Sequence, residues 1–230
     1  MTTSHQNLRA ATSVRLPVDA EWLHGDFGWP QDPKGLVVFA HGSGSSRHSP
    51  RNRYVAGVLQ KHGFGTLLID LLTEREEAID ERTAHLRFDI DMLADRLVRI
   101  ADWIKQHQDA GSLPIGLFGA STGGGAALVA AATRPQTVRA VVSRGGRPDL
   151  AGAALARVTT PTLLIVGALD RPVLQMNRDA MKQMPGDVSL EIVPGATHLF
   201  EEPGALERVA ALAADWFEKR LVSATSTVAP

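Results

Sequence analysis

The sequence contains no cysteine. Disulfide bonds, thiolate metal sites and a cysteine nucleophile are therefore excluded. An excess of one charge is also missing, because 24 Lys and Arg against 25 Asp and Glu give a formal net charge of -1 at pH 7. Surfaces that bind nucleic acid usually show a clear basic excess. We therefore expect no nucleic-acid partner.

Uninterrupted apolar segments of membrane length are missing as well. The first residues, MTTSHQNLRAATSVRL, contain no continuous apolar stretch that resembles a secretory signal. The uncharged run from Ile115 to Ala132 is long enough for a membrane helix, but Gly119 and Gly123 interrupt it and no anchors flank it. A buried strand followed by a buried helix explains the run better, so we expect a cytoplasmic protein with no membrane partner.

What the chain does contain is a repeated alternation of apolar strand candidates with helical segments. At 230 residues and 44% hydrophobic content, it can bury one substantial core. We expect a single domain over residues 13–221, with tails at 1–12 and 222–230. The alternation predicts an α/β fold with a mostly parallel sheet covered by helices on both faces. The strand candidates are 13–18, 20–29, 35–40, 63–70, 114–118, 138–143, 161–167 and 188–193.

Two further segments bear on the shape of the domain. The run TEREEAIDERTAHLR, residues 73–87, is dense in charge and predicts a solvated loop or helix face. Few residues separate Ser143 from the strand that begins near Thr162. This spacing leaves little room for a lid, so we expect an open site and no large lid domain.

The most informative motif is Gly119-Ala120-Ser121-Thr122-Gly123, which lies between an apolar strand and an Ala-rich helix. A serine on such a sharp turn needs small neighbours two positions away, and its hydroxyl is then presented at the edge of the sheet. The same turn aims the backbone N–H of Thr122 at the position where an oxyanion would form. Ser121 is thus a candidate nucleophile and Thr122 a candidate oxyanion donor. The competing interpretation is a small-residue helix start that occurs by chance.

A serine nucleophile requires a histidine base and an acid that orients it. Asp170 directly follows the buried strand 161–167, and His198 lies between the last strand and the helix that begins near Pro203. The order Ser, Asp, His is that of α/β-hydrolases. We therefore assign Ser121, Asp170 and His198 as the candidate catalytic residues.

The loop HGSGSS follows the strand 35–40, where this architecture places the second oxyanion donor. The glycines on both sides of Ser43 allow a close backbone approach, so the N–H of Ser43 is the candidate donor. His41 is expected to shape this loop rather than to act as the base. Neither a Walker loop nor a dinucleotide fingerprint fits, because the loop lacks the Gly-Lys-Ser/Thr ending and places Arg47 where the third glycine would be.

Five segments together carry a resemblance to a known family: VVFAHGSGSSRHSPRNRYVA, GLFGASTGGGAAL, SRGGRPDLA, PTLLIVGALDRPV and GATHLFEEPGAL. From Ser13 to about Leu221 the chain resembles an α/β-hydrolase of the dienelactone hydrolase-like group. The resemblance implies Ser121 as nucleophile, Asp170 as acid and His198 as base. Dienelactone hydrolases proper use a cysteine nucleophile with a glutamate near the oxyanion loop, whereas this chain has Ser121 and FAHGSG at those places.

These features together predict a serine hydrolase that cleaves carboxylic esters, among them lactones or acidic esters, through an acyl-enzyme. The expected partner is a small-molecule ester, and neither a metal nor an organic cofactor is implied. The alternatives are a thioesterase, an acyltransferase or a peptidase with the same three residues, and a non-catalytic scaffold that binds a protein partner. The oligomeric state stays open.

Four arginines follow strand ends near the expected site. Arg47 and Arg51 come after the oxyanion loop, and Arg144 and Arg147 come after the strand that ends near Ser143. Arginine suits carboxylate recognition because its donors are paired in a plane. We predict that at least one of the four, Arg144 first, favours a substrate with a second carboxylate. The alternative is that they pair with local acids such as Asp149.

Overall fold

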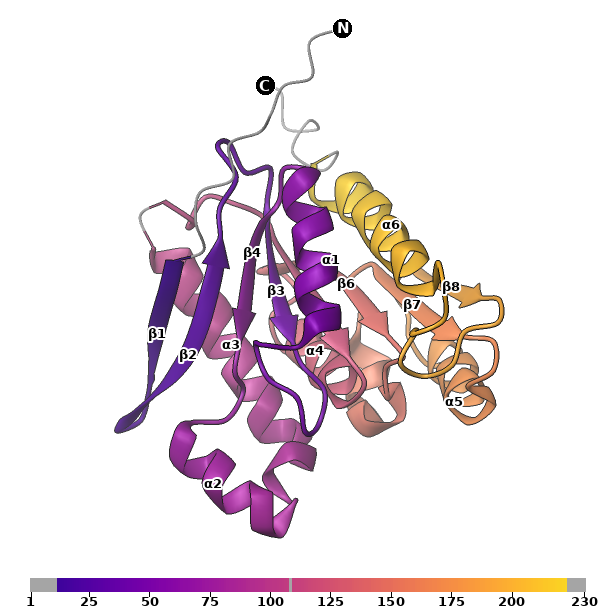
Figure 1. The fold of residues 1–230 in the computed structure, drawn as a ribbon, viewed down its shortest axis with the longest axis horizontal. Helices are drawn as coiled ribbons and strands as arrows, with labels where there is room; N and C mark the ends of the chain where they lie inside the picture. Colours follow the sequence, from indigo (N-terminus) through magenta and orange to yellow (C-terminus); the bar gives the residue numbers. More distant parts are fainter. Residues whose placement is uncertain (1–11, 108, 223–230) are drawn as a thin grey trace, which may run out of the picture.

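An eight-stranded sheet runs through the middle of the molecule (Figure 1). The computed structural model describes residues 12–107 and 109–222. The strand order is β1-β2-β4-β3-β5-β6-β7-β8; β1 pairs antiparallel with β2 and β2 with β4, and all other neighbours are parallel. The strands are β1 (Thr12–Val18), β2 (Glu21–Gly28), β3 (Leu36–Ala40), β4 (Gly65–Ile69), β5 (Ile115–Ala120), β6 (Val138–Arg144), β7 (Thr162–Gly167) and β8 (Val188–Val193).

The central strands are buried along their whole length. Every residue of β3, β4, β5 and β7 is buried, although a strand with one solvated face would alternate. Continuous apolar runs of this kind are typical of parallel strands with helices on both faces. The sequence-based prediction of a mostly parallel, doubly covered sheet is confirmed.

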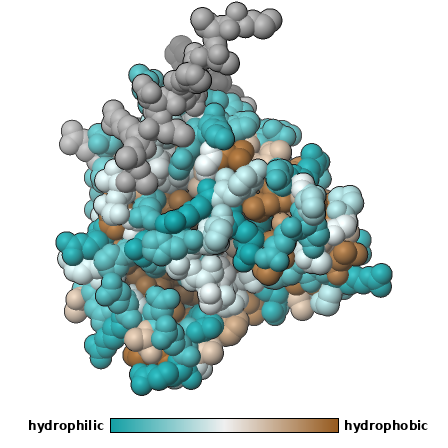
Figure 2. All heavy atoms as spheres, viewed as in Figure 1, coloured by the Kyte–Doolittle hydropathy of each residue, from teal (hydrophilic) through white to brown (hydrophobic). Residues whose placement is uncertain are grey.

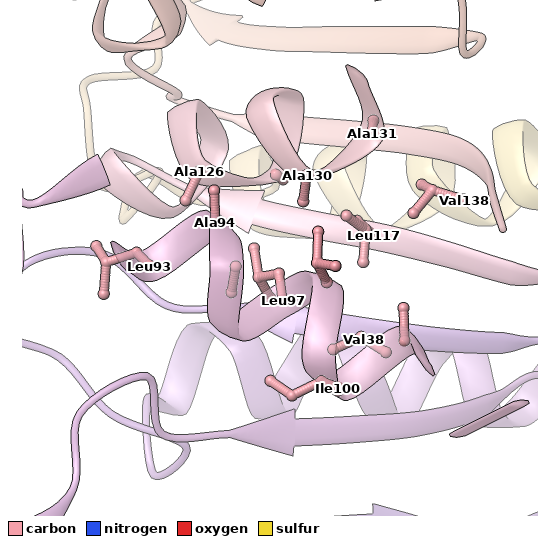
Figure 3. Close-up of a cluster of buried hydrophobic side chains, with 14 of the residues drawn as sticks. Val38, Leu93, Ala94, Leu97, Ile100, Leu117, Ala126, Ala130, Ala131 and Val138 are labelled. Atoms are coloured by element: carbon pink, nitrogen blue, oxygen red, sulfur yellow. The ribbon is translucent and has the colours of Figure 1, made fainter. Parts of the chain in front are cut away.

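Two layers of helices cover the sheet. Helices α1 (Pro50–Lys61) and α6 (Ala205–Phe217) pack on one face, in front of the strands in Figure 1. Helices α3 (Ile90–Gln106), α4 (Thr122–Thr133) and α5 (Arg171–Met181) pack on the other face. Figure 3 shows α3 beside α4, with Ala94 of α3 next to Ala126 of α4. The small side chains let α4 approach the sheet closely, which fixes the position of its first turn.

The charged run predicted as a solvated face is only partly solvated. It forms α2 (Glu74–Thr83) and η1 (Leu86–Phe88), which project beyond the ends of β3 and β4 (Figure 1). Asp80 is buried, with 2% of the residue exposed, and its carboxylate accepts hydrogen bonds from the backbone of Leu86 and Arg87 and from the Arg87 side chain. The prediction missed this burial because the partners lie six and seven residues away, on η1, outside the helix that carries Asp80.

The remaining elements are short. They are η2 (Pro148–Arg157), between β6 and β7, and η3 (Glu218–Val222), after α6. No inserted domain separates β6 from β7, in line with the expected absence of a large lid within the described residues. Thr12 belongs to β1 and Val222 to η3. The domain bounds 13–221 stay a prediction. The rest of the predicted tails, 1–11 and 223–230, lies outside the described residues.

The surface is mostly hydrophilic on the face drawn in Figure 2, with hydrophobic residues in small separate groups. Across residues 12–107 and 109–222, no helix is both long and apolar enough to cross a membrane.

Candidate active site

Ser121 occupies the turn between β5 and α4, at the edge of the sheet where the parallel strands end; we call this the carboxyl edge. Its backbone has φ 51° and ψ -121°, a conformation that residues other than glycine rarely adopt. Three hydrogen bonds hold this turn: Ser121 N–H donates to the carbonyl of Arg144, and the carbonyl of Ser121 accepts from the N–H groups of Gly124 and Arg147. Strain of this kind persists where the surroundings fix it, and it is concentrated at functional sites.

The two glycines of the motif are required by close backbone contacts. A Cβ on Gly119 would lie 2.5 Å from the carbonyl oxygen of Gly123, and a Cβ on Gly123 would lie 2.3 Å from the carbonyl oxygen of Ala40 at the end of β3. At a distance below 3.0 Å from a backbone atom, a Cβ would force the backbone itself to shift. The prediction that small residues must flank Ser121 is therefore confirmed in geometric terms.

Asp170 and His198 meet at the same edge. Asp170 is the N-cap residue of α5 after β7, and His198 lies in the loop between β8 and α6. The Nδ1 of His198 lies 2.6 Å from Asp170 Oδ2. Because an ionised carboxylate only accepts, Nδ1 carries the proton and Nε2 is left as an acceptor. The Asp170 side chain is 12% exposed and the His198 side chain 38% exposed. The imidazole is therefore partly open to solvent, whereas the carboxylate is largely shielded from it.

A cavity of about 260 Å³ joins Ser121 to His198; we call it the site cavity. It is lined by Gly42, Ser43, Ser45, Ser49, Arg51, Asn52, Ala120, Ser121, Arg144, His198 and Leu199. Among the described side chains, none makes a hydrogen bond to the Ser121 hydroxyl. In free hydrolases the bond between nucleophile and base is often long and tightens when the substrate binds.

The loop after β3 contacts the Ser121 turn directly. A Cβ on Gly42 would lie 3.1 Å from the Cβ of Ser121, so the loop backbone is packed against the serine. Thr122 is the first residue of α4, and its N–H therefore has no acceptor within the helix. The N–H of Ser43, by contrast, has an acceptor: it donates to the Thr122 hydroxyl, at 2.8 Å. The structure thus brings the two predicted oxyanion donors together, but it gives the Ser43 donor an internal acceptor.

His41 fastens the same loop to the end of β4. Its Nε2 accepts from the N–H of Leu71 at 3.0 Å, and its Nδ1 lies 3.0 Å from the carbonyl of Gly42. This pattern requires a neutral ring with the proton on Nδ1. Burial lowers the pKa of His41, although the contact with Gly42 and the charges of Asp70 and Glu77 oppose the shift. The expected loop-shaping role of His41 agrees with these contacts.

The four predicted arginines separate into two kinds. Arg47 binds Asp70 with its backbone N–H, at 2.7 Å, and with its guanidinium, which also lies 3.6 Å from Asp26. Arg147 forms two hydrogen bonds to Asp149, at 2.7 and 2.8 Å. This is the pairing with a local acid that was the alternative to substrate binding.

Arg51 and Arg144, by contrast, line the site cavity. Arg51 contacts Glu201 at 3.0 Å. Arg144 has no carboxylate partner among the described residues and is only 7% exposed.

Sequence reasoning did not single out three residues of this region. Asn52, on the first turn of α1, is 2% exposed and lines the site cavity. Leu199 lines it next to His198. Glu202 accepts the backbone N–H of Thr197 at 3.0 Å and the Thr197 hydroxyl at 2.5 Å, which holds the loop that carries His198. The signal available in the sequence was their position, directly after the oxyanion loop and directly after the histidine.

This strand order, with a strained serine between β5 and α4 and an Asp–His pair after β7 and β8, defines an α/β-hydrolase fold. The family model of the dienelactone hydrolase family matches residues 24–223. The chain belongs to this family.

Solved structures agree with this assignment. A dienelactone hydrolase from Anabaena variabilis is 59% identical, covers 94% of this chain and 100% of its own, and superposes with a TM-score of 0.91. Est1E from Butyrivibrio proteoclasticus shares the fold with a TM-score of 0.75 at 16% identity, over 90% of this chain and 98% of its own.

A curated relative has a different description. A "Putative phosphoribosyl transferase" of Mycobacterium tuberculosis is 62% identical over 188 residues, which cover 82% of this chain and 42% of the relative. The chain therefore spans less than half the length of this relative. The relative's description belongs to a much longer protein.

Proposed function

We propose that the protein is a serine hydrolase that cleaves carboxylic esters through an acyl-enzyme, with Ser121, His198 and Asp170 as the triad. The observation that carries the proposal is the strained Ser121 turn, which faces the same cavity as a histidine that is already oriented by Asp170. A backbone strain of about 1–3 kcal/mol has no structural benefit of its own, and it is a feature of exposed nucleophiles.

In the first half of the reaction, Ser121 Oγ attacks the ester carbonyl carbon while its proton moves to His198 Nε2. The carbonyl π electrons move to the oxygen and form the tetrahedral oxyanion. When this intermediate collapses, the bond to the alcohol oxygen breaks and His198 returns the proton to the leaving alcohol. The imidazolium formed in between is stabilised by Asp170 through the 2.6 Å contact.

In the second half, a water molecule gives its proton to His198 and adds to the acyl carbon. Collapse then releases the carboxylic acid and restores the Ser121 hydroxyl with the histidine proton. The oxyanion of both halves lies near the N–H groups of Thr122 and Ser43. Because Ser43 N–H donates to the Thr122 hydroxyl in the free site, it has to exchange this acceptor for the oxyanion.

The experiment that tests the proposal is active-site labelling. A fluorophosphonate probe should modify the protein once, and peptide mass mapping should locate the adduct on Ser121. Ser121→Ala should abolish labelling, whereas Ser189→Ala, a control on β8, should label like the wild type. Wild-type protein that stays unlabelled under conditions that label a known esterase would favour the scaffold alternative.

The thioesterase and acyltransferase alternatives share the acyl-enzyme. They are separated by comparing one acyl group as an oxygen ester and as a thioester, each with and without an added alcohol acceptor. A higher kcat/KM for the oxygen ester, with free acid as the product, supports the ester hydrolase. A strong preference for the thioester would instead support the thioesterase, and transfer to the alcohol in place of hydrolysis would support the acyltransferase.

A further inference from the structure

Asn177 lies on the second turn of α5 and is completely buried, with 0% of the residue exposed. Its side-chain nitrogen donates to the carbonyl of Gly146 at 3.0 Å, outside the helix, and to the carbonyl of Val173 at 2.8 Å, within it. Because carbonyl oxygens only accept, the nitrogen of the amide and not its oxygen must face them. The orientation of the Asn177 side chain is therefore fixed.

The other end of this amide is unsatisfied. Asn177 Oδ1 is buried and has no hydrogen-bond donor among the described residues. A buried acceptor without a donor destabilises a fold, and a leucine of similar volume would fill the same place without this cost. Packing alone therefore does not account for an asparagine at position 177, and the feature that remains to be explained is its bond to Gly146.

Gly146 belongs to the loop after β6 that holds the Ser121 turn. Before Gly146 in this loop, the carbonyl of Arg144 accepts the N–H of Ser121. After it, the N–H of Arg147 donates to the carbonyl of Ser121. The loop thus binds the peptide groups on both sides of the strained serine, and Asn177 is bonded to the middle of the loop.

The same loop also lies against the proposed base. A Cβ on Gly145, whose φ is 52°, would lie 3.2 Å from the carbonyl oxygen of His198 and 3.5 Å from Cε1 of its imidazole. The helix that carries Asn177 begins after its N-cap residue Asp170, the partner of His198. One side chain therefore connects the helix that starts at the proposed acid to the loop that contacts the proposed nucleophile and base.

We propose that Asn177 is a positioning residue, whose bond to Gly146 holds the loop 144–147 so that Ser121 keeps its strained conformation and faces His198. The inference rests on the proposed function for its effect on the reaction. Asn177 acts through the loop, because it is not among the described residues that line the site cavity. A misplacement of about 1 Å can cost about a hundredfold in rate, so the loss of this bond has a measurable effect.

The kinetic test replaces Asn177 with leucine, which has a similar volume and cannot donate. In Asn177→Leu, kcat for p-nitrophenyl butyrate should fall about tenfold or more per folded molecule. KM should change by less than about twofold, because the residues that line the site cavity are unchanged. The rate of fluorophosphonate labelling at Ser121 should fall by the same factor as kcat.

A second variant and a matched control separate positioning from stability. Asn177→Thr can satisfy the carbonyl of Val173 within the helix but leaves Gly146 without a donor, so it should show the same loss of kcat. The control is Ala180→Gly, about one turn further along α5, where a buried methyl group is removed. It should lower the melting temperature and keep the wild-type kcat per folded molecule.

Hydrogen exchange tests the loop without any reaction. The N–H groups of Ser121 and Arg147, which form the two bonds between the loop and the turn, should exchange faster in Asn177→Leu than in the wild type. The amides of β4 should keep their wild-type exchange rates, whereas a loss of global stability would accelerate them as well. In Ala180→Gly, no selective acceleration at Ser121 and Arg147 is expected.

Faster exchange at these two groups, together with a lower kcat at constant KM, supports the inference. Selective faster exchange in a protein that neither cleaves esters nor reacts with the probe would support the role of Asn177 in holding the loop and would reject the proposed function. The inference is overturned if the wild type is active and both variants at position 177 keep its kcat and labelling rate. It is also overturned if the exchange rates of Ser121 and Arg147 stay unchanged, and in both cases hydrolysis by the wild type leaves the proposed function intact.

Discussion

Two cavities open at the carboxyl edge, on either side of the loop that carries Ser43, and they differ in charge. The site cavity is lined by Arg51 and Arg144 and by no acidic residue. The neighbouring cavity, of about 290 Å³ and bounded by α2, is lined by Glu77, Asp80 and Glu81, and its one arginine is paired with Asp80. In the neighbouring cavity the buried carboxylate of Asp80 is paired with Arg87, which indicates a structural role for this pair. In the site cavity Arg144 is buried and has no carboxylate partner among the described residues.

The comparison depends first on Ser121, which is exposed to the site cavity alone. Ser121→Ala should lower kcat for a neutral ester by about a million-fold, because the triad acts as a unit. Stopped assays with high enzyme concentration, and mass spectrometry to exclude wild-type contamination, measure the residual rate. Ser189→Ala serves as the control, with the wild-type rate expected. More than a tenth of the activity left in Ser121→Ala would exclude the serine mechanism.

The second prediction concerns the neighbouring cavity. Burial opposes ionisation of Asp80, but hydrogen bonds from Arg87 and Leu86 outweigh it and hold the pKa of Asp80 below its ordinary value. Asp80→Asn should lower the free energy of unfolding by about 3 kcal/mol, because it leaves Arg87 without its counter-charge. Urea unfolding measures this change. The rate per folded molecule should stay near that of the wild type.

The matched control for Asp80 is Glu81→Gln, an exposed carboxylate on the same helix. It should change the free energy of unfolding by less than about 0.5 kcal/mol. Wild-type stability in Asp80→Asn together with a loss of activity would mean that the acidic cavity takes part in the reaction. The contrast between the two cavities would then be wrong.

The third prediction concerns the contact between the cavities, where Ser43 N–H donates to the Thr122 hydroxyl. Thr122→Val removes this acceptor and keeps the shape of the side chain. The free energy of unfolding should fall by about 1 kcal/mol, because a hydrogen bond is lost. The value of kcat should rise by up to about fivefold, because the donor no longer has to leave an internal acceptor before it binds the oxyanion.

Thr122→Ser keeps the hydroxyl and should behave like the wild type in both measurements. If kcat fell in Thr122→Val and stayed unchanged in Thr122→Ser, the hydroxyl would instead be needed to orient the Ser43 donor.

The smallest expected effect is a pH dependence of stability. The pKa of His41 is lowered in the folded state, so between that pKa and the ordinary histidine value of 6.5 the unfolded chain binds more protons than the folded protein. The stabilising contribution is therefore fully present above about pH 6.5 and is lost as the pH falls through the folded pKa. Unfolding free energies measured from pH 8 to pH 5 should decrease, and the decrease should be smaller in His41→Gln.

Two carboxylates of α2, Asp80 in the neighbouring cavity and Glu76 outside it, contribute to stability in a different pH range. For Glu76, burial is outweighed by hydrogen bonds from Arg96 and Thr73, so the pKa of Glu76, like that of Asp80, lies below its ordinary value. Their contributions are present at neutral pH and are lost only as the pH falls below about 4.5. An identical slope between pH 6.5 and 5 in wild type and His41→Gln would contradict the assignment to His41.

The parts that the sequence predicts well are those with local causes. Each strand end is marked by an apolar run that stops, and the Ser121 turn needs Gly119 and Gly123 for reasons within a few residues. Ser121, Asp170 and His198 could therefore be placed at one edge from their order alone. Their catalytic roles and the ester substrate stay predictions.

The charges could not be sorted in the same way, because their partners come from distant parts of the chain. Arg47 is paired with Asp70 after β4 and lies near Asp26 of β2, whereas Arg144 faces Asn52 of α1 and no acid. Nothing in the segments around the two arginines distinguishes them. Asp80 was expected in solvent and is buried instead, because its partners lie on η1, outside the helix that carries it.

The positive φ of Ser121 has a consequence for how such a chain evolves. Glycine adopts this backbone conformation without the cost that a side chain carries. Selection for a stable fold alone would therefore favour glycine at position 121. Replacing that glycine with serine would then lower the stability of the fold. If the proposed function holds, selection on what the hydroxyl does keeps a serine at position 121 against the cost of its backbone conformation.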